Sequence, residues 1–333
     1  MRAVVSASPG YAHLARREMD AVLPPGVDLA ELAPGVWLLS APGRFADRSE
    51  ELGRTVFVRH CCPADREVAL PTDQGAFVRE ALPAELPPGL QVQVRILPGG
   101  PAWPPGTLAA AVRQALRGRG SETVGGPAEH VLSIVVGTDS AFVGWGPARQ
   151  NLSPWPGGIA RLRRDPAEIS RSARKLEEAL LLFGIDPQAG QNALDLGASP
   201  GGYTGFLLGR GLRVVAVDTG ALSPRLAGAP GLTFLQGAAH GMPLPPGPFD
   251  LLTADLSWDP LRAAECALRF LPRLTPAAHG VFTIKFFGGD PLETVARVRR
   301  QLEKGYRVLA VRHLFHDRGE ATAHLQATPG AAG

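Results

Sequence analysis

The residues best suited to chemistry in this chain are two of its three lysines and two carboxylates. Among 34 basic residues only Lys175, Lys285 and Lys304 are lysine, and lysine, unlike arginine, can lose its proton in a suitable site. Burial and a neighbouring cation could lower a lysine pKa from about 10.4 by about two units, which would allow general-base chemistry near neutral pH. Asp255 and Glu320 stand at ends of expected strands and could position such an amine. The combination predicts a site that activates a hydroxyl group.

Each lysine also has a plain structural interpretation. Lys285 lies in the apolar segment 280–286, where a buried cation is costly unless it is paired. It could therefore form an ion pair with a strand-end acid and do no chemistry. Lys175 lies on an expected helix, where it could simply face solvent.

A glycine-rich turn indicates a binding site. The sequence Asp195-Leu-Gly-Ala-Ser-Pro-Gly-Gly-Tyr203 follows an expected strand and precedes an expected helix, as in α/β sheets that bind nucleotide-like ligands. Ser199 stands where the dinucleotide motif G-x-G-x-x-G requires glycine, which disfavours an NAD-dependent oxidoreductase. Asp218 ends the next strand about twenty residues later, where it could accept hydrogen bonds from ribose hydroxyls. The alternative is an ordinary tight turn beside a solvated aspartate.

Strands and helices alternate after residue 169. We expect strands at 193–196, 213–217, 232–235, 250–254, 280–286, 306–312 and 321–326, and helices at 170–183, 203–209, 261–271 and 291–303. Ser170 should cap the first helix, and Gly184 should end it. This order predicts an α/β fold with a doubly wound, mostly parallel sheet and an antiparallel end. Ligands of such sheets bind beyond the carboxyl ends of the strands, where Asp218, Asp255 and Lys285 stand.

Residues 1–148 hold shorter elements of both kinds between proline-rich joints. We expect a helix at 11–22, strands at 36–40, 55–59 and 91–97, a helix at 108–117 capped by Thr107, and a hairpin of strands 131–136 and 140–145. The order is mixed α and β, and the strand, helix and hairpin of its second half predict a small α+β domain. A structural role and a binding role are equally compatible with them.

The segment 149–168 is rich in arginine and proline and predicts a linker. Six arginines lie in it or just beyond it: Arg149, Arg161, Arg163, Arg164, Arg171 and Arg174. Together with Trp155, and with only Asp165 and Glu168 to offset them, they could bind phosphates and stack on bases. We therefore expect contact with RNA, and the alternative is a solvated tether between domains.

The bulk composition disfavours several other classes of protein. The formal net charge is only +3, so charge alone is weak evidence for nucleic acid. Three cysteines without a Cys-x-x-Cys pattern argue against a disulfide framework and a zinc site. No apolar run of about 18 residues is present, and the first residues do not resemble a signal peptide. We expect a cytoplasmic protein without a membrane span or a metal, of undetermined oligomeric state.

The same stretches resemble the FtsJ-like (RrmJ-like) 2′-O-ribose RNA methyltransferases, whose signature is a Lys-Asp-Lys-Glu tetrad. The resemblance is carried by Ser170-Arg-Ser-Ala-Arg-Lys175-Leu-Glu-Glu, Asp195-Leu-Gly-Ala-Ser-Pro-Gly-Gly202, Ala-Asp255-Leu-Ser-Trp, Thr-Ile-Lys285-Phe-Phe and His316-Asp-Arg-Gly-Glu320. It implies a Rossmann-like class I methyltransferase domain at 169–328 that uses S-adenosylmethionine. Lys285 would be the general base or steer the 2′-hydroxyl, and Asp255 would orient it. Lys175 would bias the proton equilibrium, and Glu320 would hold the lysine pair.

One branch of this family is closer than the rest. Trp155-Pro-Gly-Gly-Ile-Ala-Arg-Leu162 and the segment 316–320 resemble the RlmM branch, which methylates a cytidine ribose in bacterial large-subunit (23S) rRNA. This resemblance implies a ferredoxin-like domain at 1–75, a THUMP-like RNA-binding domain at 76–148 and large-subunit rRNA as the partner. The alternatives are methylation of tRNA or another RNA, and an RNA-binding protein that keeps the fold without catalysis.

The resemblance also implies a set of cofactor-binding residues. They are Asp195, Gly197, Ala198, Ser199, Pro200, Gly201, Gly202, Tyr203, Asp218, His240 and Asp255. The chain departs from the family in one place, because many members have an acidic residue near the adenine and Leu235-Gln-Gly-Ala-Ala-His-Gly-Met242 has none. Backbone groups, His240 or Met242 would then have to recognise the adenine.

Overall fold

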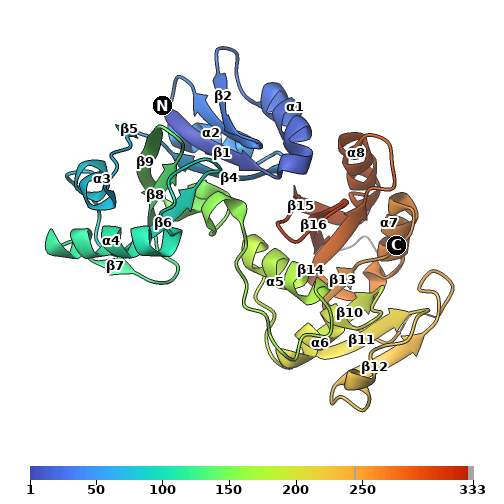
Figure 1. Cartoon of the computed structure of the whole chain (residues 1–333). Coiled ribbons are helices and arrows are strands. Elements are labelled where there is room, and N and C mark those ends of the chain that lie inside the picture. Colours follow the sequence, from blue (N-terminus) through green and yellow to red (C-terminus); the bar gives the residue numbers. More distant parts are fainter. Residues whose placement is uncertain (244, 329–333) are drawn as a thin grey trace. The chain divides into compact units, whose positions relative to one another are not determined.

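The computed structural model describes residues 1–243 and 245–328, which form two compact units, Met1–Ile159 and Ala160–Gly333 (Figure 1). We call them unit 1 and unit 2 and treat each by itself. None of the described helices is both long and apolar enough to cross a membrane.

Unit 1 begins with a four-stranded antiparallel sheet in the order β2-β3-β1-β4. Its elements are β1 (Arg2–Ala7), α1 (Ala12–Val22), β2 (Asp28–Ala33), β3 (Val36–Ser40), α2 (Phe45–Leu52) and β4 (Val58–Pro63). Strand β4 begins at Val58, whereas the sequence pattern predicts its start at Thr55. Helix α1 buries Leu14, Ala15 and Met19, whose helical spacing gives the helix one apolar face.

The second sheet of unit 1 has five strands in the order β5-β9-β8-β6-β7. Its elements are β5 (Arg66–Ala69), α3 (Gln74–Ala81), β6 (Leu90–Ile96), α4 (Pro105–Gly118), β7 (Thr123–Val124), β8 (His130–Val136) and β9 (Ser140–Pro147). The predicted hairpin is confirmed, because β8 and β9 pair antiparallel across Gly137–Asp139. β6 pairs parallel with β8 and packs with α3 and α4 around one apolar core.

The two sheets of unit 1 share buried side chains. One cluster joins Val4, Val36 and Cys62 of the first sheet with Val135 and Phe142 of the second. The start of the predicted linker also packs within this unit. Asn151 is buried, Gln93 Nε2 donates to Pro154 O at 2.8 Å, and the turn at 157–158 is buried. Residues 151–158 are therefore folded and are not a solvated tether.

Unit 2 contains a seven-stranded sheet in the order β12-β11-β10-β13-β14-β16-β15. Its strands are β10 (Asn192–Leu196), β11 (Arg213–Asp218), β12 (Leu232–Gln236), β13 (Phe249–Ala254), β14 (Leu274–Lys285), β15 (Tyr306–Arg312) and β16 (Glu320–Ala327). The first five strands of that order pair parallel, and β16 pairs antiparallel with both β14 and β15. The predicted mostly parallel sheet with an antiparallel end is confirmed.

Four helices accompany this sheet. They are α5 (Ser172–Phe183), α6 (Gly202–Gly209), α7 (Pro260–Arg269) and α8 (Pro291–Leu302). Helices α5 and α6 bury their apolar sides in one cluster with residues of β10, β11, β13 and β14. Helices α7 and α8 pack against each other on the opposite side of these strands (Figure 1). The sheet is therefore covered on both faces, as a doubly wound fold requires.

Two predicted helix starts were wrong. Helix α5 begins at Ser172, and Ser170 does not cap it, because its hydroxyl bonds to the Ser172 hydroxyl at 2.7 Å. Helix α4 begins at Pro105, before Thr107, because the fixed φ of proline suits a first helical turn whose N–H groups have no helical acceptor. The predicted end of α5 is confirmed, since Gly184 adopts a left-handed conformation there.

The close approach of β9 to β4 can be tested with a single methyl group. A Cβ at Gly144 would collide with the backbone carbonyl of Pro63, whereas a Cβ at Gly106 on α4 would meet nothing. We expect Gly144→Ala to lower the stability of unit 1 by about 1–3 kcal/mol through overpacking, and Gly106→Ala to leave it unchanged or raise it by up to about 1 kcal/mol. Thermal and urea unfolding would measure both; equal stability of the two variants would contradict the packing.

Candidate active site

The fold brings the four predicted chemical residues together at one edge of unit 2. Lys285 is the last residue of β14 and Glu320 is the first of β16, and the antiparallel register pairs them directly. Asp255 follows β13, the parallel neighbour of β14, so its carboxylate reaches the same edge. Lys175 comes from the first turn of α5. Three strand termini and one helix therefore position the site.

The four side chains form a ring in which positive and negative charges alternate. Lys175 Nζ lies 2.7 Å from Asp255 Oδ2 and 3.0 Å from Glu320 Oε1. Lys285 Nζ lies 2.7 Å from Asp255 Oδ1 and 2.6 Å from Glu320 Oε2. Each ammonium thus contacts both carboxylates, and the formal charge of the ring is zero. We call this arrangement the Lys–carboxylate ring.

The ring stabilises its own charges. Burial by itself would lower the pKa of Lys175, but the Asp255 and Glu320 carboxylates outweigh burial and raise it. Burial would likewise raise the pKa of Asp255, and the two lysines outweigh burial and lower it. Lys175 is therefore held as an ammonium, and the sequence-based expectation of a lowered lysine pKa does not apply to it. The side chain of Lys285 is the more exposed of the two, at 20% against 5%.

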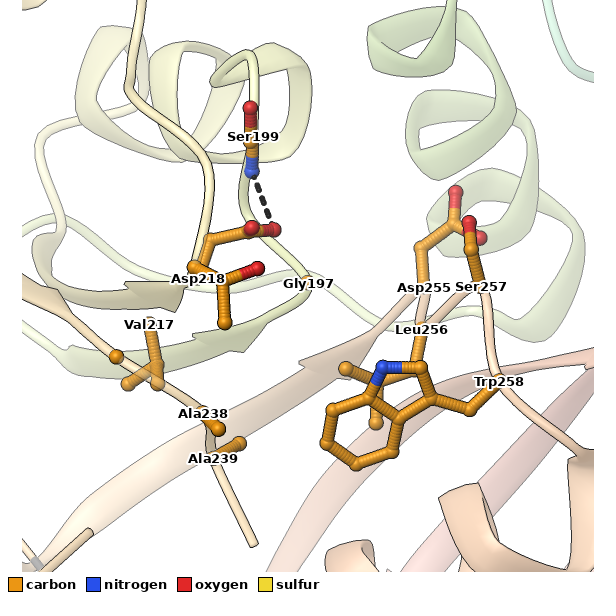
Figure 2. Close-up of a pocket in the computed structure, with 12 residues that line it drawn as sticks. Gly197, Ser199, Val217, Asp218, Ala238, Ala239, Asp255, Leu256, Ser257 and Trp258 are labelled. Carbon is orange, nitrogen blue, oxygen red and sulfur yellow. Dashed lines mark hydrogen bonds between the residues drawn. The ribbon is translucent and has the colours of Figure 1, made fainter. Parts of the chain in front are cut away.

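A first hollow, with a cavity volume of about 280 Å³, opens at the carboxyl ends of β10 to β13. It is lined by Gly197 and Ser199 of the glycine-rich turn and by residues 217–219, 237–239 and 255–258. Figure 2 shows Asp218 and Trp258 on opposite sides of this hollow, with the carboxylate of Asp255 pointing away from the indole ring. Gly197 has a φ of +79°, and a Cβ there would lie 2.5 Å from the Asp255 carbonyl oxygen. Only glycine fits this position.

Asp218 organises the wall of the first hollow. Its Oδ2 accepts a hydrogen bond from Ser199 N at 2.9 Å, and its Oδ1 accepts one from Gly220 N at 2.7 Å (Figure 2 shows the first). The carboxylate therefore fixes two loops that border the hollow. Each oxygen has a further lone pair, so it can still accept a hydroxyl from a ligand.

The predicted cofactor residues divide into two groups. Gly197, Ser199, Asp218 and Asp255 line the first hollow. The others do not line it: Asp195, Ala198, Pro200, Gly201, Gly202, Tyr203 and His240.

Several of the second group support the turn instead. Asp195 is fully buried and accepts hydrogen bonds from the hydroxyls of Thr204 at 2.6 Å and Thr253 at 2.8 Å. Burial raises its pKa to about 6. It ties β10 to α6 and β13 and lies too deep to contact a ligand in this hollow. His240 is exposed and contacts the edge of Trp258, with ring centroids 5.3 Å apart.

Trp258 and the residues beside it were missed by sequence reasoning. Residues 237–239 follow directly after β12, and residues 255–258, with Trp258, follow directly after β13. The rule that ligands bind beyond the carboxyl ends of strands could have identified both groups. Residues 237–239 (Gly-Ala-Ala) offer backbone groups and small side chains to the first hollow. The expectation that backbone groups replace an acidic residue near the adenine is compatible with this wall.

A second hollow lies on the other side of Asp255. It is lined by the Lys–carboxylate ring and by residues from the start of α5 and the loop before β16: Arg171, Ser172, Arg174, Phe315, His316 and Arg318. Of the six predicted RNA-binding arginines, only Arg171 and Arg174 line it. Arg161, Arg163 and Arg164 are exposed on the segment before α5, and Arg149 is exposed in unit 1. Asp255 belongs to both hollows.

The loop between β15 and β16 is held in place by two buried acids. Glu178 of α5 accepts hydrogen bonds from the backbone N–H groups of Phe315 and His316, and its Oε2 lies 2.6 Å from His316 Nδ1. Asp317 accepts bonds from Leu314 N at 2.9 Å and from the Thr322 hydroxyl at 3.1 Å. These contacts place His316 and Arg318 at the second hollow. Sequence reasoning missed both as site residues, although the 316–320 motif contains them.

The fold and this site can be compared with known proteins. Residues 169–321 match the model of the family described as FtsJ-like methyltransferase, so this part of the chain is similar to the methyltransferase domain of that family.

Curated relatives extend the similarity beyond that domain. The chain is similar to three proteins named Ribosomal RNA large subunit methyltransferase M. It is 33% identical to that of Azoarcus sp. (strain BH72), over 62% of this chain and 59% of the relative. It is 34% identical to that of Methylococcus capsulatus, over 65% of this chain and 62% of the relative. It is 36% identical to that of Halorhodospira halophila, over 61% of this chain and 59% of the relative. The match thus spans about three fifths of the length of these relatives.

Asp317 should make the stability of unit 2 depend on pH. Burial raises its pKa from 3.8 to about 8, so between these values the folded state binds more protons than the unfolded state. Stability should therefore fall as pH rises from about 4 to about 8. In Asp317→Asn this pH-dependent loss of stability should disappear. The melting temperature of the variant minus that of the wild type should therefore increase as pH rises.

Melting curves between pH 5 and 9 would measure this difference. Thr322→Val is the control, because it removes a hydrogen-bond donor to Asp317 and keeps the ionisable carboxyl. It should lower the melting temperature and retain the fall with pH. A constant difference between Asp317→Asn and the wild type across this range would contradict the assignment.

Proposed function

We propose that the chain is an S-adenosylmethionine-dependent 2′-O-ribose methyltransferase that acts on large-subunit rRNA. One observation carries this proposal: Asp255 lines both hollows, and the other three members of the Lys–carboxylate ring line the second. A methyl donor in the first hollow and a ribose hydroxyl in the second would therefore meet at the ring. The names of the curated relatives support rRNA as the substrate class.

The first hollow fits S-adenosylmethionine. Gly197 leaves the turn open beside the Asp255 backbone, Asp218 can accept a ribose hydroxyl, and Trp258 offers an apolar ring face. The small residues at 237–239 leave backbone groups available to the adenine. When bound, the cofactor supplies a methyl group carried on a sulfonium ion.

The ring residues then act on the acceptor. Lys285 Nζ is the less buried of the two nitrogens. As a neutral amine it would receive the proton of the 2′-hydroxyl, and as an ammonium it would only steer that hydroxyl. Asp255 orients Lys285 and borders the methyl group, and Glu320 holds the two lysines at a fixed separation. Lys175, kept charged by both carboxylates, would bias the proton equilibrium of the site and contact the phosphate or ribose of the target nucleotide. Since four contacts of 3.0 Å or less fix these groups, orientation would supply much of the rate.

The remaining parts of the proposal concern RNA. Arg171, Arg174 and Arg318 border the second hollow and would bind phosphates on either side of the target nucleotide. The exposed Arg161, Arg163 and Arg164 would extend this contact along the strand. In unit 1 the first sheet would be the ferredoxin-like domain and the five-stranded sheet the THUMP-like RNA-binding domain. Such an enzyme would meet its rRNA in the cytoplasm.

Replacing Lys285 tests the catalytic assignment. Lys285→Arg keeps the charge and removes the titratable amine, so we expect transfer of labelled methyl from S-adenosylmethionine to RNA to fall by about 10²- to 10⁴-fold. Lys304→Arg is a matched control, because Lys304 is an exposed lysine bonded to Gln301 and lines neither the first nor the second hollow. It should methylate at the wild-type rate.

The substrate for this assay is RNA from a strain that lacks the gene, separated into large-subunit rRNA, small-subunit rRNA and tRNA. Wild-type activity of Lys285→Arg would overturn the general-base role. Methylation of tRNA alone would replace the rRNA substrate, and labelling of no RNA would favour a non-catalytic RNA-binding protein.

Asp218 should be needed for the cofactor. Asp218→Ala removes the acceptor of two backbone N–H groups and of the ligand hydroxyl, and a hydrogen bond to a charged group contributes about 1.5–3 kcal/mol. We expect the Kd for S-adenosylmethionine, measured by calorimetry, to rise at least about tenfold. Asp73→Ala removes a carboxylate that likewise accepts a backbone N–H, from Ala76 in unit 1, and should leave the Kd unchanged. Equal Kd values for the two variants would refute the role of Asp218.

A further inference from the structure

A third hollow, with a cavity volume of about 220 Å³, opens beside the Lys–carboxylate ring. Its walls come from the start of α7, the turn after β14 and one face of α8, and include Leu261, Phe287, Arg297 and Val298. Lys285 lines this hollow as well as the second one. The two hollows therefore meet at the amine placed to act on the acceptor hydroxyl.

Phe287 is the unusual feature of this hollow. It is 66% exposed, more than any other large hydrophobic side chain among the residues described. It stands two residues after Lys285 and is followed by Gly288 and Gly289, both with positive φ. A phenyl ring that remains exposed beside an active site presents a face on which a planar base can stack.

The chemistry of a nucleotide limits what can occupy the third hollow. The 2′-oxygen and the base are attached to neighbouring carbons of one five-membered ring, so a base must lie close to the hydroxyl that Lys285 contacts. The first hollow would hold the methyl donor. The second is bordered by three arginines, which suit phosphates. The third combines the phenyl ring of Phe287 with polar side chains such as Asp259 and Thr294, which suit the flat face and the hydrogen-bonding edge of a base.

Arg297 adds a cation to the rim of this hollow. It is exposed on α8, one helical turn from Thr294, which also lines the hollow. A guanidinium group can stack on a base or donate hydrogen bonds to its edge. An aromatic face and a planar cation together form the kind of contact that single-stranded nucleic acids make with proteins.

We propose that the third hollow binds the base of the nucleotide that is methylated, with Phe287 as its stacking face and Arg297 at its rim. This inference rests on the proposed function, because it assumes that Lys285 acts on a ribose hydroxyl. The base site is a separate element of substrate binding, because the contacts within the Lys–carboxylate ring form without it. Binding of the base there would turn the 2′-hydroxyl toward Lys285 and Asp255.

Removing the phenyl ring tests this site. In Phe287→Ala we expect the Kd and the KM for large-subunit rRNA to rise about 5- to 150-fold, as loss of one base–aromatic stack predicts. Phe287→Trp keeps a stacking face and should stay within about threefold of the wild type on the same reasoning. Leu309→Ala on β15 is the control for loss of an exposed apolar side chain, since Leu309 is 40% exposed and lies outside the three hollows. It should change neither constant, and all variants should bind S-adenosylmethionine like the wild type.

Salt dependence separates stacking from phosphate contact. Phe287→Ala should leave the slope of log Kd against log salt concentration unchanged, whereas Arg171→Ala should reduce it by about one. If Phe287→Ala instead changed this slope and Phe287→Trp failed to restore affinity, the ring would not be a stacking face.

A final comparison identifies the base. Once the methylated position is mapped, a short RNA with an abasic ribonucleotide at that position can be compared with the intact RNA. The wild type should bind the abasic RNA more weakly than the intact RNA, whereas Phe287→Ala should bind the two RNAs equally well. Equal losses in both proteins would assign Phe287 to another nucleotide and overturn the inference, while the proposed function stands. If the wild type methylates no RNA, the proposed function fails, and the inference fails with it.

Discussion

The Lys–carboxylate ring is the constraint on which the rest of unit 2 depends. A buried ammonium or carboxylate is costly unless it is paired, and each of the four groups has two partners of opposite charge within 3.0 Å. Because the ring is largely buried, with side chains 5–20% exposed, removing one member would leave its neighbours without full charge compensation. The ring therefore ties α5, β13, β14 and β16 together at the edge of the sheet where the chemistry would occur.

Further acids position the parts that surround the ring. Glu178 and Asp317 hold the loop before β16, Asp218 holds the glycine-rich turn, and Asp195 ties β10 to its neighbours through two threonine hydroxyls. These carboxylates differ in environment. Burial raises the pKa values of Asp195 and Asp317, at Asp317 against the opposing charge of Lys175, whereas Asp255 contacts two lysines and has a lowered pKa. Aspartate therefore holds backbone segments in place at positions 195 and 317, and it stabilises the charges of the two lysines at position 255.

The three hollows divide the proposed work by chemistry. The first combines a carboxylate, small residues and an indole ring, the second is bordered by arginines, and the third combines an exposed phenyl ring with polar side chains. Two side chains join them, since Asp255 lies between the first and second and Lys285 between the second and third. The methyl donor, the phosphate backbone of the RNA and the target base would thus meet at Asp255 and Lys285, two neighbouring members of the ring.

Hydrophobic periodicity, turn residues and strand ends are local signals, and they were enough to predict the alternation of elements in unit 2, the glycine-rich turn and the four residues of the ring. The rarity of lysine made two of those residues stand out. The assembled fold was needed to show that Lys175 is held charged, that Asp195 supports the turn while Asp218 faces the first hollow, and that His316, Arg318 and Phe287 border the site. The contacts responsible join residues as far as 80 and 145 positions apart, and their distances and burial arise only when the strands have assembled.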